Sequence, residues 1–304
     1  MTMLVGICSA KPNERTDVSE TEPTRGRLVV VATPLGNLGD LSRRALELLR
    51  DADVVYCEDT RRSSTLFSAN GIAVRARLKA LHEHNEASQC REIVSRVAEG
   101  QVVVLVSDAG TPGISDPGSR VVAAVAEAGL DVTTAPGPSA VVAALSISGL
   151  ATDRFCMEGF LSRKAGERER LYELWMREPR TTVFYESPQR IVATLLELVE
   201  HFAERRVAVA REMTKLHEEV IRGTVAEVAS IMAQRPVLGE IVVVLAGAPE
   251  PEPSDEHQIR RALAARFEGG MSTRDAVTQV ADELDVARRV VYAVALEIRS
   301  DGGH

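Results

Sequence analysis

The sequence is short of several features by which a protein class is often recognised. Aromatic residues make up only 4% of its 304 residues, so a platform of many stacked aromatic side chains is not expected. No apolar run approaches the ~18 residues of a membrane-spanning helix, and the run at 3–8 is too short for a secretory signal. The four cysteines form no CxxC pair and lie near no histidine cluster, which argues against a disulfide framework and a zinc site. They are Cys8, Cys57, Cys90 and Cys156. We therefore expect a cytoplasmic protein that makes no contact with a membrane.

Three common ligand-binding motifs are also missing. No GxGxxG, GxxxxGK[ST] or HExxH pattern occurs, so the standard dinucleotide, P-loop and zinc-protease interpretations have no support. The net charge of -8 argues against broad electrostatic attraction to nucleic acid, although it leaves room for a local basic face.

The first half of the chain alternates between strand and helix patterns. After a polar, proline-containing stretch at 1–26, which we expect to be a disordered leader, five apolar runs each lead through a loop into an amphipathic helix. Such alternation predicts a doubly wound α/β domain with a parallel sheet over residues 27–150.

The second half has more closely spaced strand patterns. Two of them are separated only by 213–215, which indicates a hairpin, so we expect a mixed sheet in a second α/β domain at 151–248. An acidic, proline-alternating linker follows at 249–256, and a helical tail of three helices at 257–304. Short helices joined by tight turns are typical of DNA-reading modules, but small three-helix tails more often serve packing or dimer contact.

The loop at 107–118 is the most informative stretch. Its glycines and prolines fix the backbone and let main-chain groups approach a flat or anionic ligand closely. Asp108 and Asp116 would repel phosphate but accept hydrogen bonds from a ribose hydroxyl or an amino group, which indicates a nucleoside-like ligand. The alternative is a tight turn with a helix cap at Ser115 or Asp116.

Three other loops follow predicted strands, at 33–40, 58–62 and 136–140. If the sheet is parallel, all four loops converge on one edge, which a two-domain chain would turn into a cleft. In the second of them, Glu58 or Asp59 could accept a proton or bind a sugar hydroxyl while Arg61 holds a phosphate. A strand-end ion pair is the simpler alternative.

Two histidines and a basic run complete the candidates. His82 and His84 could share a metal, but no further ligands lie at metal-binding spacing, so we expect solvated or substrate-facing imidazoles and no metal. Basic residues could form a phosphate-binding rim or a solvated helix face. They are Arg61, Arg62, Arg163, Lys164, Arg168 and Arg170.

Six motifs, in this order, resemble those of the bacterial small-subunit ribosomal RNA methyltransferase I family, within the tetrapyrrole methylase superfamily. They read TPLGNLGD at 33–40, EDTR at 58–61, SDAGTPGISDPG at 107–118, PGPSA at 136–140, FYESP at 184–188 and REMTK at 211–215. The similarity covers about residues 27–248 and continues in the tail as GMSTRDAV at 270–277.

This resemblance implies a fold, a cofactor and partners. It implies two α/β domains of the tetrapyrrole-methylase (class III methyltransferase) type, S-adenosylmethionine in the cleft between them, and a homodimer. It also implies 2'-O-methylation of a cytidine in the decoding region of 16S rRNA in the small ribosomal subunit. The residues that would hold the cofactor are Asp108, Ala109, Gly110, Thr111, Pro112, Ser139, Ala140 and Tyr185. The loops at 34–40 and 58–61 would face the substrate.

The resemblance assigns no catalytic base. Methyl transfer from a sulfonium is an in-line displacement whose rate comes largely from positioning, while the weakly acidic ribose hydroxyl profits from a nearby base. We expect Glu58 or Asp59 to accept the proton and Arg61 to clamp a phosphate.

Two rival functions remain open. One is a methylase of a tetrapyrrole or precorrin-like macrocycle on the same fold. Two features argue against this function: the first loop, TPLGNLGD, has fewer glycines than is expected of those enzymes, and Arg61 and Arg62 accompany it. The other is a non-enzymatic rRNA-binding assembly factor, which would bind RNA regardless of cofactor.

Overall fold

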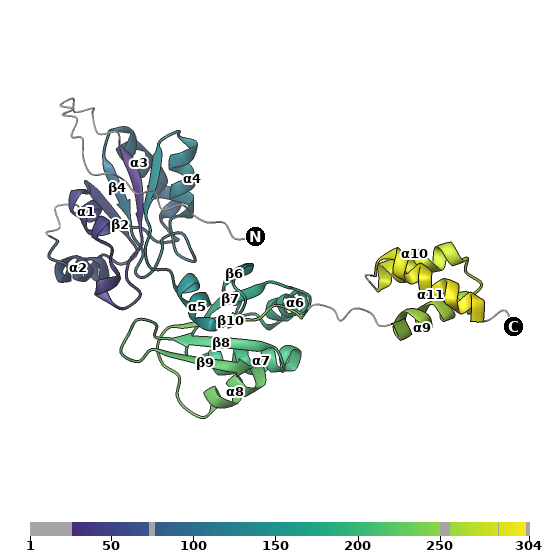
Figure 1. Ribbon diagram of the computed structural model, residues 1–304. Helices are drawn as coiled ribbons and strands as arrows, with labels where there is room; N and C mark the ends of the chain where they lie inside the picture. The colour runs from purple at the N-terminus through teal and green to yellow at the C-terminus, as the bar shows by residue number, and fades with distance from the viewer. Residues whose placement is uncertain (1–25, 73–76, 250–255, 285, 302–304) are drawn as a thin grey trace, which may run out of the picture. The chain divides into compact units, whose positions relative to one another are not determined.

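The computed structural model describes residues 26–72, 77–249, 256–284 and 286–301 (Figure 1). The chain divides into two compact units. The first holds the described residues up to Glu169 together with Thr181–Ala246, and the second holds Arg170–Arg180 with the described residues from Gly247 onward. The predicted leader and linker lie, apart from their edges, outside the described residues. No helix among the described segments is both long and apolar enough to cross a membrane.

The first sheet has five parallel strands in the order β3-β2-β4-β1-β5. They are β1 (Arg27–Val31), β2 (Val54–Cys57), β3 (Arg77–Ala80), β4 (Val102–Leu105) and β5 (Asp131–Ala135). The first helices of the chain are η1 (Leu38–Asp40), α1 (Arg43–Asp51), α2 (Thr60–Ala69), α3 (Glu86–Ala98) and α4 (Ser119–Glu127). The predicted parallel α/β arrangement is therefore confirmed.

Apolar side chains cover both faces of this sheet, which explains why its strands read as unbroken apolar runs. Along β1, Val29 and Val31 join a buried cluster with residues of α1 and α2. Leu28, which points to the opposite face, joins a second cluster with residues of α3 and α4. Strand residues alternate between faces, so helices on both sides require apolar residues at every position.

The strand order makes the end of β4 the natural ligand-binding edge. β4 leads to α4 on one face of the sheet, whereas its two neighbours, β1 and β2, lead to α1 and α2 on the other face. The loops therefore diverge on both sides of β4, and such switch points leave a crevice at the carboxyl edge.

Hydrogen bonds from other elements fix the course of the loop that follows β4. Thr33 and Gly110 exchange two backbone hydrogen bonds, of 2.8 and 3.0 Å, and the Thr33 hydroxyl donates to the carbonyl of Ser107 at 3.0 Å. At the other end, the buried carboxylate of Glu86 accepts from the backbone N–H groups of Gly118 and Arg120 at 2.9 and 3.0 Å.

The cap of α4 is therefore supplied from α3. The predicted alternative, a cap at Ser115 or Asp116, is wrong because α4 begins at Ser119 with Gly118 in the cap position. Glycine has no side chain to accept a hydrogen bond, and Glu86 supplies the acceptor instead.

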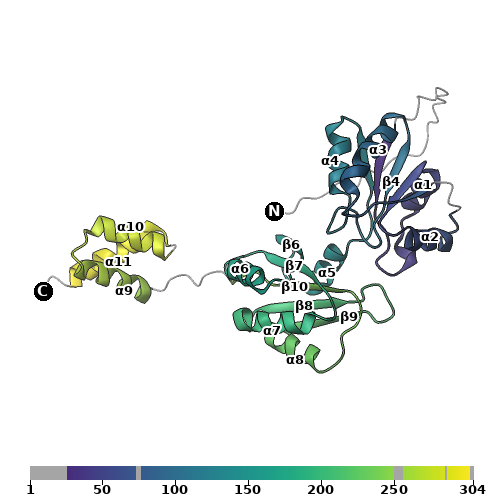
Figure 2. The same ribbon diagram turned by 180° about the vertical axis from the view of Figure 1, so that it is seen from behind.

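The second sheet is mixed, as expected, with the order β6-β7-β10-β8-β9. Its strands are β6 (Phe155–Phe160), β7 (Thr181–Glu186), β8 (Arg206–Arg211), β9 (Glu219–Thr224) and β10 (Ile241–Leu245). β6 and β7 are parallel and the other pairs antiparallel, and the predicted hairpin is β8–β9 with a loop at 212–218. Helix α5 (Ala140–Ser148) packs on one face, and α7 (Ile191–Phe202) and α8 (Val225–Ala233) lie on the other (Figures 1 and 2). Helix α6 (Ala165–Trp175) follows β6.

Three helices form the tail, as predicted: α9 (Glu256–Glu268), α10 (Thr273–Glu283) and α11 (Arg288–Asp301). They share an apolar core of their own. The predicted cap of α10 is present, since the Ser272 hydroxyl accepts from the N–H of Asp275 at 3.2 Å.

Replacing Glu86 by Ala should destabilise the protein. The variant leaves the N–H groups of Gly118 and Arg120 without their acceptor, and Gly118 is buried, so we expect the free energy of unfolding to fall by about 1–3 kcal/mol. Denaturant titration measures the loss. Glu86→Gln, which keeps an acceptor oxygen, should lose less, and the exposed Glu83→Ala serves as control. Equal stability of Glu86→Ala and the control would show that this cap does not matter.

Candidate functional site

The four predicted loops do meet in one cavity. It has a volume of about 520 Å³ and lies at the carboxyl edge of the first sheet. Leu35, Glu58, Asp108 and Ser139 line it, one from each loop that follows β1, β2, β4 and β5. Residues of the second sheet and its loops form the opposite wall. The convergence predicted from strand order is confirmed.

Most residues of the predicted cofactor set line this cavity. Those that do are Asp108, Ala109, Gly110, Thr111, Ser139, Ala140 and Tyr185. Pro112 does not line it; it is buried behind the loop. The contacts of these predicted residues with the cofactor remain a prediction.

The loop after β4 depends on glycine at two positions, Gly110 at the cavity and Gly118 at the start of α4. Gly110 has a φ of 85°, in the left-handed region that other residues rarely adopt. Gly118 has a φ of 134°, and a Cβ added to it would come within 2.7 Å of the Leu105 side chain. The Thr111 hydroxyl donates to the carbonyl of Pro138 at 3.0 Å, which ties this loop to the one after β5.

The Asp108 carboxylate connects the loop after β4 with the start of α2. Its Oδ1 accepts from the N–H of Asp59 at 3.1 Å, and its Oδ2 accepts from Arg62 Nη1 at 3.1 Å. The side chain is 19% exposed and Arg62 is 70% exposed, so the ion pair sits at the cavity mouth. Asp108, which the sequence predicted only as a ligand-binding residue, thus also positions the start of α2.

The three predicted catalytic residues do not lie together. Glu58 lines the cavity, whereas Asp59 and Arg61 do not. Asp59 is the N-cap of α2 and accepts from the N–H of Arg61 at 2.8 Å; backbone hydrogen bonds of this kind lower the pKa of Asp59. The Arg61 side chain is 93% exposed, and Arg62, which the sequence placed only in a basic rim, lies at the cavity instead.

Five carboxylate residues line the cavity. Glu58, Asp108 and Asp116 come from the loops of the first sheet, and Glu186 and Glu240 belong to the opposite wall. Burial, reinforced by the charges of Glu58 and Asp108, raises the pKa of Asp116 to about 6. Desolvation, followed by the charge of Asp108, also raises the pKa of Glu58. Burial raises the pKa of Tyr185 to about 12, with a further contribution from Asp116. This concentration of negative charge suits a cationic ligand group.

The opposite wall carries an aromatic pair and several apolar side chains. The Phe160 and Tyr185 rings lie 5.3 Å apart, and Phe160 is 63% exposed. Met213, Ile241 and Val242 add apolar surface, and the aromatic pair with this surface suits a planar ring system. Phe160 could not be predicted from the sequence, because its place beside Tyr185 follows from the pairing of β6 with β7.

Two charged residues, one in the FYESP motif and one in the predicted basic run, form pairs that support the fold. The buried Glu186 accepts from the Thr194 hydroxyl at 2.8 Å and pairs with Arg190 at 3.4 Å. Arg168, in the basic run, forms two hydrogen bonds with Glu197, at 2.8 and 2.6 Å. The rings of His82 and His84 lie 6.1 Å apart, and among the described residues no group of three possible metal ligands occurs.

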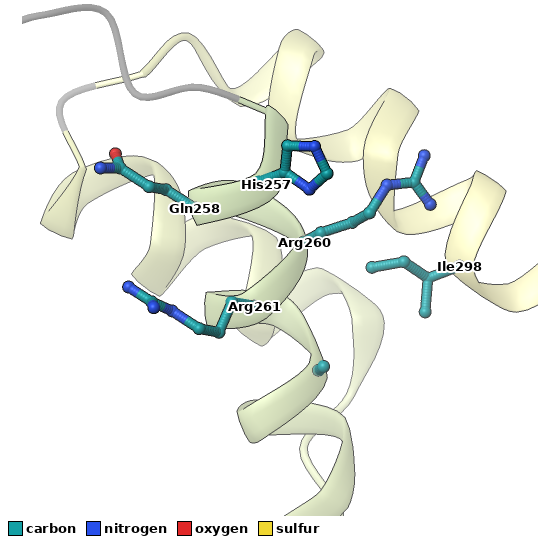
Figure 3. Close-up of a pocket in the computed structure, with 6 residues that line it drawn as sticks. His257, Gln258, Arg260, Arg261 and Ile298 are labelled. Carbon is teal, nitrogen blue, oxygen red and sulfur yellow. The ribbon is translucent and has the colours of Figure 1, made fainter.

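The tail has a hollow of its own, about 700 Å³, between α9 and α11 (Figure 3). Its described lining contains no carboxylate and none of the predicted site residues. One of its cations, Arg260, is already paired with Glu256 and Glu297. The cavity of the first unit is therefore the candidate site.

Comparison with known proteins places these features in a family. The family described as Tetrapyrrole (Corrin/Porphyrin) Methylases matches residues 27–229. The protein named ribosomal RNA small subunit methyltransferase I from Synechocystis sp. is 42% identical over 280 residues, which cover 91% of this chain and 100% of that protein. Its namesake from Mycobacterium tuberculosis is 45% identical over 282 residues, which cover 91% and 97%.

Solved structures show the same fold. A cobalt precorrin-4 methyltransferase superposes with a TM-score of 0.56 at 19% identity, covering 75% of this chain and 98% of that one. Diphthine synthase superposes with a TM-score of 0.54 at 18% identity, covering 72% and 89%. At such identities the likeness concerns the fold alone.

The pKa of Asp116 predicts a pH-dependent stability. Because the folded-state pKa lies above the ordinary 3.8, this group's contribution to stability is fully present below about pH 4 and is lost as the pH rises through about 6. Asp116→Asn should therefore raise the free energy of unfolding by about 1–3 kcal/mol at pH 7.5 and change it little at pH 4.

Denaturant titrations at both pH values, without added ligand, test this. Asp51→Asn, at an exposed position, is the matched control. A variant that is equally stabilised at both pH values, or at neither, contradicts the prediction.

Proposed function

The chain belongs to the tetrapyrrole methylase family and, within it, to the ribosomal RNA small subunit methyltransferase I proteins, and from this premise we propose its reaction. It is an S-adenosylmethionine-dependent methyltransferase, and the proposed acceptor is the ribose 2'-hydroxyl of a cytidine in the decoding region of 16S rRNA. One observation carries the proposal: four motif-bearing loops meet in one cavity, in a chain that matches nearly the full length of these relatives.

The cavity suits the cofactor chemically. The cofactor is cationic at its sulfonium and amino groups, and five carboxylates line the cavity. The Phe160–Tyr185 pair and the apolar surface beside it suit an adenine ring, and Gly110 lets the main chain come close. We propose that the cofactor is held by Asp108, Ala109, Gly110, Thr111, Ser139, Ala140 and Tyr185, with Pro112 supporting the loop from behind. When bound, it supplies an electrophilic methyl group.

Glu58 is the better-placed proton acceptor. It lies at the cavity mouth and its pKa is raised, and a raised pKa makes a carboxylate a stronger base. Asp59 is less suited, since its oxygen caps α2 and its pKa is lowered. Arg61 pairs with Asp59 at 3.7 Å, but its side chain is 93% exposed and would meet a phosphate of a large substrate. Arg62 would hold the ribose end of the substrate near Asp108.

The rival functions have weaker support. The cobalt precorrin-4 methyltransferase shares the fold but is only 19% identical, whereas the two relatives above 40% identity act by name on small-subunit rRNA. A binding factor without methyl transfer would have no use for a cavity shaped for the cofactor.

We also propose the cellular setting and the layout of the chain. The protein would act in the cytoplasm, as a homodimer, on 16S rRNA in the small ribosomal subunit. Its proposed parts are a leader at 1–26, α/β domains at 27–150 and 151–248, a linker at 249–256 and a helical tail at 257–304.

One assay tests the reaction. The protein is incubated with methyl-labelled S-adenosylmethionine and 30S subunits that lack modifications, and the label is mapped within the 16S rRNA. We expect label on one cytidine ribose. Label on a base, or no label, refutes the proposed function.

Glu58→Gln tests the base. The substitution keeps the shape and removes the proton acceptor, so we expect kcat to fall roughly 10²–10⁴-fold while the Kd for S-adenosylmethionine stays within a few-fold. Asp59→Asn, which keeps a good N-cap residue, should retain nearly full activity. If Asp59→Asn is the more damaging change, the assignment is reversed.

A further inference from the structure

The tip of the loop after β4 lies between the two walls of the cavity. The Gly113 N–H donates to the carbonyl of Pro117 at 3.2 Å and so closes the loop at its base, and the residues between them, 114–116, all line the cavity. The tip also comes close to the second sheet, since a Cβ added to Gly159 of β6 would lie 3.4 Å from the Ser115 hydroxyl. The loop tip is thus near groups of both walls.

Ser115, at this tip, holds a backbone conformation that non-glycine residues seldom adopt. Its φ is 61°, in the left-handed region. Such a conformation persists only where the surrounding structure imposes it, and it is found most often at functional sites. The residue that follows, Asp116, lines the cavity and is half-buried. The position of the Asp116 carboxylate is therefore set by the fold before a ligand binds.

Asp116 lies within electrostatic reach of both walls. Burial is the main reason for its raised pKa, and the charge of Glu58, from the loop after β2, adds to the effect. On the opposite wall, burial raises the pKa of Tyr185, and the charge of Asp116 adds to that effect. Glu58 is the proposed proton acceptor and Tyr185 a proposed cofactor contact. Asp116 is therefore close to both the substrate side and the cofactor side of the cavity.

The carboxylates of the cavity differ in how their charge is balanced. Three of them each pair with a cation: Asp108 with Arg62, Glu186 with Arg190 and Glu240 with Lys215. In the part of the chain that the structure describes, Glu58 and Asp116 have no ion-pair partner. Glu58 becomes neutral when it accepts the proton in the proposed reaction. Asp116 is thus the carboxylate whose charge stays unbalanced throughout.

Methyl transfer changes the charge of the bound ligand far more than its shape. The carbon–sulfur bond breaks as the bond from carbon to the ribose oxygen forms, its electron pair stays on sulfur, and the hydroxyl proton passes to Glu58. A sulfonium cation thereby becomes a neutral thioether, while the adenosine and amino-acid parts are unchanged. Protein contacts with those shared parts hold both forms alike. A difference in affinity therefore needs a group that responds to the charge at sulfur.

We propose that Asp116 faces the sulfonium and makes the cavity bind S-adenosylmethionine in preference to the product, S-adenosylhomocysteine. In a partly desolvated site, an ionised carboxylate attracts a cation more strongly than it does in water, and it gains little from a thioether. The attraction offsets the cost of placing this carboxylate near others. It is lost when the methyl group leaves, which favours release of the product. This inference rests on the proposed function.

Asp116→Asn tests the inference by calorimetric titration with each ligand at pH 7.5, where a group with a pKa of about 6 is ionised. We expect the Kd for S-adenosylmethionine to rise at least about 10-fold and that for S-adenosylhomocysteine to change by less than about 3-fold. Sinefungin, which carries an ammonium group in place of the methylated sulfur, should weaken as S-adenosylmethionine does. Asp116→Glu, which keeps the charge, should retain most of the preference.

Glu240→Gln is the matched control. It removes another carboxylate of the same cavity, but one whose charge Lys215 already offsets at 3.1 Å, so the ratio of the two Kd values should stay within about 3-fold of the wild type. An equal loss of both ligands in Asp116→Asn overturns the inference, because the carboxylate would then meet the amino group that the two ligands share. Unchanged affinities, or an equal change of the ratio in the control, overturn it as well.

The failure of this inference and the failure of the proposed function are distinguishable. If the wild type labels no ribose in unmodified 30S subunits, the proposed function fails. If the wild type labels the ribose and Asp116→Asn keeps the wild-type ratio of the two Kd values, the proposed function stands and this inference fails.

Discussion

The site depends on the pairing of Thr33 with Gly110. These two residues belong to loops that follow adjacent parallel strands, and their exchanged hydrogen bonds form an isolated antiparallel bridge beyond the ends of β1 and β4. This bridge holds Gly110 in its left-handed conformation, and Glu86 fixes the far end of the same loop. The backbone between them is thereby set before any ligand binds, so a ligand need not order it.

The cavity holds more negative charge than stability alone would favour. Glu58 and Asp116 are each partly withdrawn from water and near another carboxylate, and both have raised pKa values. The other carboxylates that line the cavity, Asp108, Glu186 and Glu240, each pair with a cation. Within the described residues, Glu58 and Asp116 form no such pair. An arrangement that opposes folding at neutral pH is typical of a binding site, where a cationic ligand offsets the repulsion.

Much of this was predictable from the sequence, and the limits have physical causes. Strand and helix alternation predicted the parallel sheet and the convergence of four loops, because strand direction alone determines which edge they share. The alternation could not show which of Glu58, Asp59 and Arg61 lines the cavity, because where a strand passes into a helix each residue points in a new direction. The capping function expected of Asp116 belongs to Glu86, which lies 32 positions from Gly118 in the chain. Likewise, Phe160 reaches the cavity only through the pairing of distant strands.

The strand order also has a consequence for how the protein folds. β1 lies between β4 and β5, so the first strand of the sheet pairs only with strands that begin at residue 102 or later. The Thr33 hydroxyl likewise donates to a carbonyl 74 residues away in the chain. Contacts of such long sequence separation require the closure of large loops and form slowly. A partly folded chain therefore has no cavity, and a ligand of the cavity stabilises the completed fold alone.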